Sequence, residues 1–338
     1  MSSNRLSVRT KVLRVLAWVF ALPAGLGGLG SMGGAFSEQL DLLANLTPLW
    51  LACGLIGAVL WLSAGRRGAA LPALCLIGVS VGAFLMAPEF IAAAKPKYKP
   101  SPNAEIYKIL QFNVWEGNRD SAGTAAYIRT TGADIVMMEE NSYGAATIPD
   151  RLKDIYPYQI HCGQQSGRPC GVTVLFKHKP DRGGGQGPPP AVWTTNQLPK
   201  TTHWFEAVAL HNLWPTNPYQ AVQRRTMSGR VSGSAKGAII VGGDYNMTPW
   251  SWAMRRQDKA YGMERRTRAV FSWPARFDRF ALAPFPFLPI DHVYAGAEWK
   301  IVSIERGPRT GSDHYPVLVT LAYEGGPPPY KPEPMPPP

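Results

Sequence analysis

The 338-residue sequence predicts an α/β sandwich of sheets with outer helices, preceded by three transmembrane helices. Three apolar stretches occupy most of the first 94 residues. Beyond them, short runs of β-branched and aliphatic residues recur, and they outnumber the stretches of helical character. Strand-like and helix-like segments alternate irregularly, which favours a sandwich of sheets over a doubly wound parallel sheet.

The apolar stretches cover residues 15–32, 46–65 and 68–87. Each is about long enough to cross a hydrocarbon core, which takes roughly 17–25 residues. Only four charged side chains occur between positions 15 and 87: Glu38, Asp41, Arg66 and Arg67. A buried helical bundle, or a signal peptide in the first stretch, is the alternative. Three successive stretches favour a membrane anchor over residues 1–94.

Basic residues near the apolar stretches predict the orientation of the chain. Four precede the first stretch and two lie between the second and third: Arg5, Arg9, Lys11, Arg14, Arg66 and Arg67. The loop between the first two stretches carries acidic residues and no base. This pattern predicts a multi-pass protein of the inner membrane, with a cytoplasmic N-terminus and a periplasmic domain after the spans. The bases at Lys95, Lys97 and Lys99 oppose it.

The four cysteines divide into two pairs. Cys53 and Cys75 lie in the predicted spans, where they pack as small apolar residues. Cys162 and Cys170 flank a polar loop and are candidates for a disulfide in an oxidising compartment. Free thiols are the alternative, and a zinc site would need further ligands at short spacing.

The remainder of the chain divides into three segments. Residues 95–103, with three prolines, predict an extended linker, and residues 104–323 predict one compact domain. Residues 324–338 form a Pro-rich tail that we expect to be disordered or polyproline-II-like. The net charge of +12 suits polyanionic partners but identifies none, and no protein partner can be inferred.

Polar side chains follow several of the strand-like runs. Asn113 ends one run, Glu140 follows a second, and Asp244 and Asn246 follow a third that ends in two glycines. Oxygen ligands of this kind suit a hard divalent cation such as Mg²⁺ or Mn²⁺. Each motif alone is weak, because Asp-x-Asn often marks a turn and a strand-end Glu is often a surface residue.

Asp-His pairs occur at two further strand ends. Asp291 precedes His292, and Asp313 precedes His314, while His211 ends another apolar run. A carboxylate facing an imidazole holds one tautomer and stabilises the imidazolium, which suits proton transfer and contacts with phosphate. Either pair taken singly could be a structural hydrogen bond.

The combination resembles the endonuclease/exonuclease/phosphatase superfamily, which has the deoxyribonuclease-I-like fold. The resemblance covers residues 104–323, and its main carriers are the motifs at Asn113, Glu140, Asp244–Asn246, Asp291 and Asp313-His314. With the N-terminal spans, the chain is similar to a membrane-bound bacterial branch. The resemblance implies a four-layer α/β sandwich and hydrolysis of a phosphodiester or phosphomonoester with Mg²⁺ or Mn²⁺.

The resemblance also implies a set of metal ligands. Glu140 would be the central ligand, completed by Asn113 and Asp313. Glu139 stands where the family usually has Gln, and we expect it to be a solvated neighbour that adds negative charge.

Five further residues take catalytic roles by the same resemblance. Asp244 would position or deprotonate the attacking water, and Asn246 would contact the phosphate. His314 would lie by the scissile phosphate, oriented by Asp291. His211 would stabilise the developing negative charge.

Two substrate classes remain open at this stage. A nuclease needs a basic groove with stacking aromatics, for which the candidates are Arg224, Arg225, Arg265, Arg266, Arg268, Trp250 and Trp252. A phospholipid-type substrate would suit tethering at the lipid bilayer and the apolar loop 280–288. A different alternative is a non-enzymatic membrane sensor or scaffold that retains the fold.

Overall fold

The computed structural model describes residues 7–65, 68–163, 170–187, 189–200, 203–233, 237–276 and 285–325. The chain folds into two compact units. The first comprises Met1–Ala92 together with the distant segment Thr248–Arg256, and the second comprises Ala93–Met247 and Gln257–Pro338. The predicted tail lies outside the described residues from position 326 onward.

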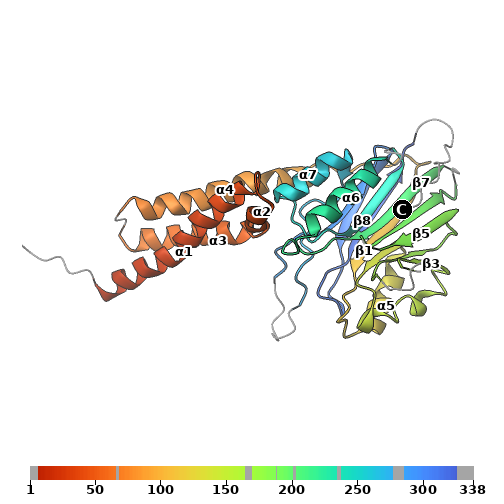
Figure 1. Ribbon diagram of the computed structural model, residues 1–338, viewed down its shortest axis with the longest axis horizontal. Helices are drawn as coiled ribbons and strands as arrows, with labels where there is room; N and C mark the ends of the chain where they lie inside the picture. Colours follow the sequence, from red (N-terminus) through yellow and green to blue (C-terminus); the bar gives the residue numbers. More distant parts are fainter. Residues whose placement is uncertain are drawn as a thin grey trace, which may run out of the picture. The chain divides into compact units, whose positions relative to one another are not determined.

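The described N-terminal residues of the first unit form four helices (Figure 1): α1 (Val8–Gly33), α2 (Glu38–Asn45), α3 (Thr47–Ser63) and α4 (Ala70–Ala93). Among the described residues, α1 and α4 are each long and apolar enough to cross a membrane. Helices α2 and α3 meet that test only as a pair, and the pair is bent by 59°. The prediction of three spans is therefore narrowed to two, or three if the bent pair is one span, because α3 alone has 17 residues.

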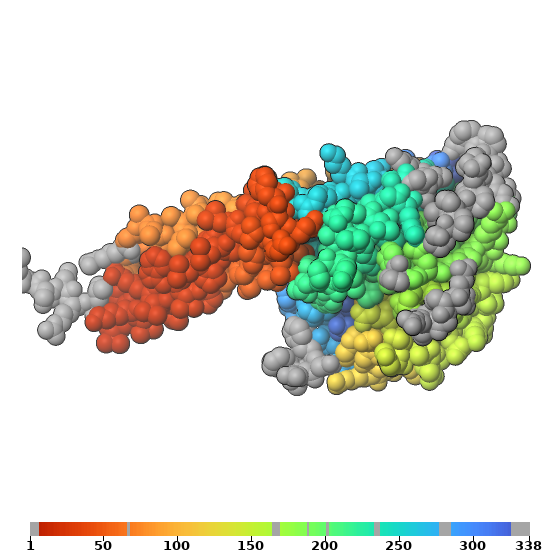
Figure 2. All heavy atoms as spheres, in the orientation of Figure 1, coloured from red at the N-terminus to blue at the C-terminus, as the bar shows by residue number. Residues whose placement is uncertain are grey.

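The helices of the first unit pack through small residues and expose large apolar ones. A Cβ added to Gly28 would lie 3.3 Å from the Cα of Gly78, so α1 and α4 approach closely there. Along α1, Leu22, Leu26 and Leu29 are exposed, and Figure 2 shows this helix in red at the surface. An exposed leucine stripe of this kind suits contact with lipid tails.

The second unit contains two six-stranded sheets. The first has the order β11-β12-β1-β2-β4-β3, with bounds Trp299–Arg306, Val317–Tyr323, Glu105–Asn113, Ile135–Glu139, Thr173–Phe176 and Tyr158–His161. The second has the order β5-β6-β7-β8-β10-β9, with bounds Arg182–Gln186, Ala191–Gln197, Trp204–His211, Ile239–Asp244, Asp291–Ala295 and Glu264–Arg265. The prediction of an α/β fold with sheets is confirmed.

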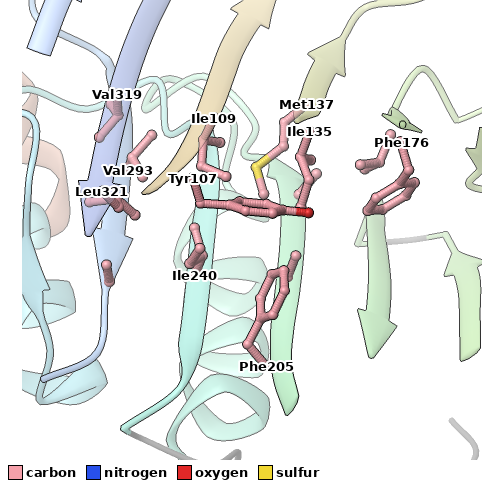
Figure 3. Packing of buried hydrophobic residues seen from close by; sticks show 14 of the residues in the cluster. Tyr107, Ile109, Ile135, Met137, Phe176, Phe205, Ile240, Val293, Val319 and Leu321 are labelled. Atoms are coloured by element: carbon pink, nitrogen blue, oxygen red, sulfur yellow. The ribbon is translucent and has the colours of Figure 1, made fainter. Parts of the chain in front are cut away.

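The main core lies between the two sheets (Figure 3). Tyr107 and Ile109 of β1 point toward Ile240 and Phe205 of the other sheet. Because successive side chains of a strand alternate between its faces, the even-numbered neighbours of Ile109 face the opposite way. There Phe112 packs with Ile128 in a second cluster.

Helices and short 3-10 turns complete the second unit. Helix α5 (Ser121–Thr131) supplies Ile128 to the second cluster and therefore covers the outer face of the first sheet. The turns η1 (Tyr143–Ala145) and η2 (Asp150–Leu152) follow β2. Helix α6 (Gln220–Gly233) lies beside β8 in Figure 1. The first five residues of α7 (Trp252–Tyr261) belong to the segment assigned to the first unit.

Candidate active site

Polar side chains from both sheets converge where the strands end. Parallel strands β7 and β8 place His211 opposite Asp244, and the antiparallel partner β10 places Asp291 opposite Asp244 as well. In the first sheet, parallel strands β1 and β2 place Asn113 opposite Glu139. Because these strand ends share one edge of the sandwich, residues that are distant in sequence meet there.

One cluster gathers around Asn113. Its Nδ2 donates to Glu140 Oε1 at 2.9 Å and to Asp244 Oδ2 at 3.0 Å. His211 Nε2 lies 3.8 Å from each of the same two carboxylate oxygens. Glu140 has a positive φ of 52°, an uncommon conformation for a residue with a side chain. Such backbone strain is found where the surrounding structure holds a side chain in a required direction.

A second cluster joins the first at Asp244. His314 Nδ1 lies 2.8 Å from Asp291 Oδ2, and His314 Nε2 lies 3.7 Å from Asp244 Oδ2. All three side chains are almost fully buried. Asp313 Oδ1 lies 4.0 Å from His314 Nε2, so the ligand predicted next to this histidine faces the same space.

Asn246 completes the set beside His211. Its Nδ2 donates to the carbonyl of Asn212 at 2.9 Å and lies 3.3 Å from His211 Nε2. Its backbone N–H donates to Asp244 Oδ1 at 2.8 Å, and its φ is 51°. The Oδ1 of Asn246 is buried and receives no hydrogen bond from the described residues. The structure thus brings all eight predicted site residues into one neighbourhood.

Burial and charge set the protonation of the buried cluster. Burial raises the pKa of Asp244 to about 8, although nearby His314 opposes this rise. Burial alone would lower the pKa of His314, but the carboxylates of Asp291 and Asp244 raise it well above its ordinary value. His314 is therefore an imidazolium. For Asp291, the effect of that cation outweighs burial, and its pKa is lowered.

The more open side of the site behaves differently. Burial lowers the pKa of His211, so this imidazole is neutral and can donate or accept a proton. Burial raises the pKa of Asp313. The side chains of Glu140, His211 and Asp313 are each about one-fifth exposed, whereas those of Asp244 and His314 are almost fully buried.

The donor set fits a divalent cation. Ligand atoms of Glu140, His211 and Asp244 all lie within 4.8 Å of one another. Asp313 Oδ1 is a buried acceptor that receives no hydrogen bond from the described part of the chain. Carboxylate oxygens crowded in this way repel one another, and a cation relieves the repulsion and favours their charged forms. Oxygen ligands of this type suit Mg²⁺ or Mn²⁺.

Sequence reasoning placed Glu139 wrongly and gave Gln111, which precedes Asn113 in the same motif, no role. Glu139 is fully buried, not a solvated neighbour. Gln111 Nε2 donates to Glu139 Oε2 at 2.9 Å and to Asp291 Oδ1 at 3.0 Å, so one amide links both carboxyl groups. Burial raises the pKa of Glu139 well above its ordinary value, and it is held as the neutral acid. Side chains two positions apart on a strand lie on the same face, so Gln111 could have been predicted to face the site together with Asn113.

Two supports of Asp313 and His314 were also missed. Ser312 Oγ donates to the carbonyl of Asn113 at 2.7 Å and accepts the N–H of His314 at 3.0 Å. Trp273 Nε1 donates to Asp313 Oδ2 at 3.2 Å. Ser312 directly precedes Asp313 and could have been included on that ground. No sequence signal identifies Trp273, which precedes Asp313 by 40 positions.

The site opens into a pocket of about 890 Å³. Glu140, His211, Asp313 and His314 line it at one side. Aromatic residues provide much of the remaining lining: Trp115, Tyr143 and Trp214. The guanidinium of Arg276 lies 5.5 Å from the ring centroid of Trp115 and holds that indole by a cation–π contact.

Of the five arginines predicted for the basic groove of a nuclease, three are buried, whereas Arg225 is exposed and Arg268 is half-buried. Arg224, Arg265 and Arg266 are buried, and so is Trp250. Arg265 pairs with Asp258, and Arg266 donates to the carbonyls of Ala295, Gly296 and Trp299. Long basic side chains with partners of this kind stabilise the fold and are not available to phosphates. Most of the predicted loop 280–288 lies outside the described residues.

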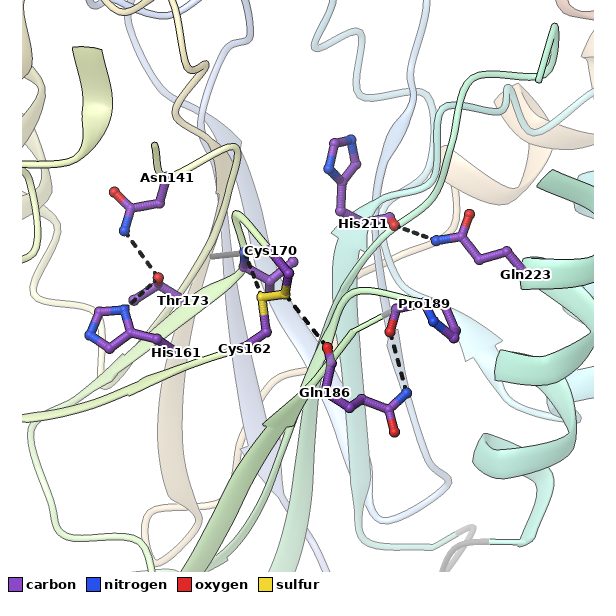
Figure 4. The surroundings of a disulfide bond; sticks show 10 residues. Asn141, His161, Cys162, Cys170, Thr173, Gln186, Pro189, His211 and Gln223 are labelled. Atoms are coloured by element: carbon purple, nitrogen blue, oxygen red, sulfur yellow. Dashed lines mark hydrogen bonds between the residues drawn. A yellow bond between two sulfur atoms is a disulfide. The ribbon is translucent and has the colours of Figure 1, made fainter. Parts of the chain in front are cut away.

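Cys162 and Cys170 are joined as a disulfide close to the pocket (Figure 4). Cys170 lines the pocket, and the carbonyl of the next residue, Gly171, accepts the N–H of Asn141 at 2.9 Å. On the other side, Gln223 Nε2 donates to the carbonyl of His211 at 2.7 Å. The disulfide and this amide thus support the backbone beside Glu140 and His211.

A model of the Endonuclease/Exonuclease/phosphatase family matches residues 110–314, from β1 to His314. The chain belongs to this family. No curated protein sequence matches it. The match includes every residue of the two clusters, so the geometry and the family assignment concern the same part of the chain.

Solved structures resemble the chain in fold. A family protein from Bacteroides vulgatus has a TM-score of 0.53 and 18% identity, and the match covers 65% of this chain and 99% of that one. A family protein from Bacteroides thetaiotaomicron has 0.52 and 16%, covering 65% and 99%. A mannosyl-6-phosphatase from the same organism has 0.50 and 17%, covering 64% and 100%. At these identities the likeness establishes the fold alone.

Proposed function

We propose that the protein is a membrane-anchored, divalent-metal-dependent phosphoesterase. The observation that carries the proposal is the convergence of Asn113, Glu140, Asp244 and His211 beside the His314–Asp291 pair, next to a pocket that Glu140, His211 and His314 line. Members of the family are typically metal-dependent hydrolases that act on phosphoesters. The intact donor set supports an enzyme over a non-enzymatic sensor or scaffold.

Glu140, Asn113 and Asp313 would hold the metal. Bound there, Mg²⁺ or Mn²⁺ would supply charge neutralisation at the phosphate oxygens. Two observations support a cation here: Glu140 Oε1 and Asp244 Oδ2 lie against the same Asn113 amide, and Asp313 Oδ1 is a buried acceptor with no hydrogen bond from the described residues.

The remaining residues would act on water and phosphate. Asp244 would orient the attacking water and accept its proton as the water oxygen bonds to phosphorus and the ester P–O bond breaks. The His314 imidazolium, held by Asp291, would donate to a phosphate oxygen. His211 and Asn246, whose side chains lie 3.3 Å apart, would donate to the same group from the other side.

The lining of the pocket favours a small or lipid-type phosphoester over a nucleic acid. Trp115, Tyr143 and Trp214 offer flat apolar surfaces beside the metal ligands, and Glu116 adds negative charge. To bind the phosphates of a nucleic acid, the protein would need exposed Lys or Arg side chains, whereas three of the candidate arginines are buried. Nucleic acid remains the alternative that a substrate panel tests.

The protein would work at the inner membrane with its catalytic domain in the periplasm. Two or three helices are apolar enough to span a membrane, and the bonded Cys162–Cys170 pair suits an oxidising compartment. The disulfide supports the orientation predicted from the basic residues, and that orientation requires the bent pair α2–α3 to be the third span.

The test is hydrolysis by the full-length protein, purified in detergent micelles. The panel contains p-nitrophenyl phosphate, bis(p-nitrophenyl) phosphate, sphingomyelin, phosphatidylcholine, phosphatidylinositol phosphate, DNA and RNA. We expect turnover that EDTA abolishes and that Mg²⁺ or Mn²⁺ restores, and that Asp244→Asn removes. Glu305→Gln, an exposed carboxylate on β11, is the control. Failure to hydrolyse any substrate with either metal would favour the scaffold.

A further inference from the structure

A short segment of the chain belongs to the unit of membrane helices, although it follows the catalytic loop in sequence. Thr248–Arg256 is grouped with the N-terminal helices and not with the sheets on either side of it in sequence. Only Tyr245, Asn246 and Met247 separate Thr248 from Asp244. The segment that directly continues the Asp244–Asn246 motif is therefore held by the anchor.

Asn45, the last residue of α2, holds the start of this segment. Its Oδ1 accepts the N–H of Thr248 at 2.8 Å and the hydroxyl of Thr248 at 3.0 Å. Its carbonyl accepts Trp250 Nε1 at 3.3 Å. Asn45, Thr248 and Trp250 are all buried, so loss of these bonds would leave polar groups without water to replace them.

Asp41 holds the end of the segment where α7 begins. Its Oδ1 accepts the N–H of Trp252 and its Oδ2 accepts the N–H of Ala253, each at 2.7 Å. The first N–H groups of a helix have no partner within the helix, and a carboxylate there is favoured by the helix dipole as well. Asp41 is only 3% exposed, and its own carbonyl accepts Asn45 Nδ2 at 3.2 Å. One turn of α2 thus caps a helix from a remote part of the chain.

Proline restricts the backbone of the segment. Pro249 fixes its own φ and restricts Thr248 to extended backbone. On the other side, the N–H of Tyr245 donates to the carbonyl of Ile290 at 3.0 Å. Between the two attachments, Asn246 has a positive φ, and the carbonyl of Met247 lies 3.1 Å from His292 Nε2 of β10. A misplacement of about 1 Å in a catalytic group can cost about 100-fold in rate.

We propose that Asp41 and Asn45 are positioning residues for the hydrolysis, acting through Thr248–Arg256 on Asp244 and Asn246. The expected fall in turnover rests on the proposed function, whereas the expected change in amide hydrogen exchange does not. A merely structural role would lower stability and leave the turnover of the folded protein unchanged.

The test compares Asp41→Ala, Asp41→Asn and Asn45→Ala in the full-length protein, in detergent micelles. Asp41→Asn keeps one acceptor oxygen, so it retains one of the two caps and serves if Asp41→Ala does not fold. Glu38→Gln is the matched control, because Glu38 lies on the same helix and its ion pair with Arg256, at 3.2 Å, joins two partly exposed side chains. Exposed ion pairs of this kind contribute little stability. The readouts are amide hydrogen exchange over residues 244–256, and kcat and KM for bis(p-nitrophenyl) phosphate with Mg²⁺.

We expect Asp41→Ala and Asn45→Ala to raise exchange at 248–253 and also at 245–247. In the same two variants, we expect kcat to fall at least about tenfold while KM changes less than about threefold. The fall in kcat should be smaller in Asp41→Asn and less than about twofold in Glu38→Gln. Exchange confined to 248–253, or an unchanged kcat in a folded variant, overturns the inference. If the wild type hydrolyses nothing, the proposed function fails, and exchange at 245–247 still decides whether the anchor holds the loop.

Discussion

Replacing Asp291 by Asn should slow turnover by disrupting the orientation and charge of His314. The Asp291 carboxylate accepts from His314 Nδ1 at 2.8 Å and from Gln111 Nε2 at 3.0 Å, one donor to each oxygen. An asparagine offers one acceptor oxygen, so its amide N–H₂ must face one of these donors. Either His314 loses its partner, or its Nδ1 becomes the acceptor and the wrong tautomer forms.

The magnitude follows from the kind of hydrogen bond that is lost. A hydrogen bond to a charged group contributes about 1.5–3 kcal/mol, which corresponds to roughly 10- to 150-fold in rate. Because orientation and charge matter most in the transition state, the loss should fall on kcat and leave KM nearly unchanged. The substitution should also change the dependence of rate on pH.

The sign of the pH effect is set by His314. The carboxylates of Asp291 and Asp244 raise its pKa well above the ordinary value, so the imidazolium persists below that raised pKa and is lost as pH rises through it. Removing one carboxylate lowers this pKa, and the alkaline limb of the kcat profile should move to lower pH. The assay is hydrolysis of bis(p-nitrophenyl) phosphate by the full-length protein across pH.

Asp154→Asn removes an aspartate whose side chain is 65% exposed and is the control for loss of one charge. It should match the wild type in kcat, KM and pH profile. An Asp291→Asn protein whose kcat stays within about twofold of the wild type, or whose alkaline limb does not move, would refute the reasoning.

Three further outcomes are expected. Glu140→Ala should abolish Mg²⁺-dependent hydrolysis while the protein stays folded, which kinetics and circular dichroism check together. Gly243→Ala should lower the apparent Tm by at least about 5 °C, because its Cβ would lie 1.9 Å from the carbonyl oxygen of Leu210. In protein denatured without reductant, thiol alkylation should modify two of the four cysteines, because Cys162 and Cys170 are bonded.

Each of these outcomes has a matched comparison. Glu305→Ala, at an exposed strand position, should keep the activity of the wild type. Metal-dependent turnover by Glu140→Ala would show that Glu140 is not a metal ligand. Gly184→Ala should leave the Tm unchanged, because nothing lies within 4 Å of its Cβ, and equal Tm values for the two glycine variants would contradict the argument from contact. Alkylation of all four cysteines without reductant would exclude the disulfide in the isolated protein.

Much of the candidate site could be predicted from local pattern. Glu140 and Asp244 each follow a short apolar run, and a polar residue at the end of a buried strand is recognisable without knowledge of its neighbours. The pairing of Asp291 with His314 came from resemblance, and the structure places their side chains 2.8 Å apart. Strand β5 was not recognised, because its sequence Arg-Gly-Gly-Gly-Gln has no β-forming residue.

By itself, the sequence determined the α/β class, the apolar N-terminal helices and the identity of the strand-end residues, since all three depend on periodicity over a few positions. Tertiary structure decided which charges face the site. Arg265 was expected at a surface and is buried against Asp258, while Glu139 was expected in solvent and is buried behind Gln111. Asp41 read as a loop charge between two spans, yet it caps an amide 211 positions away. A hydrogen bond across that separation depends on packing of the whole chain, which no local pattern encodes.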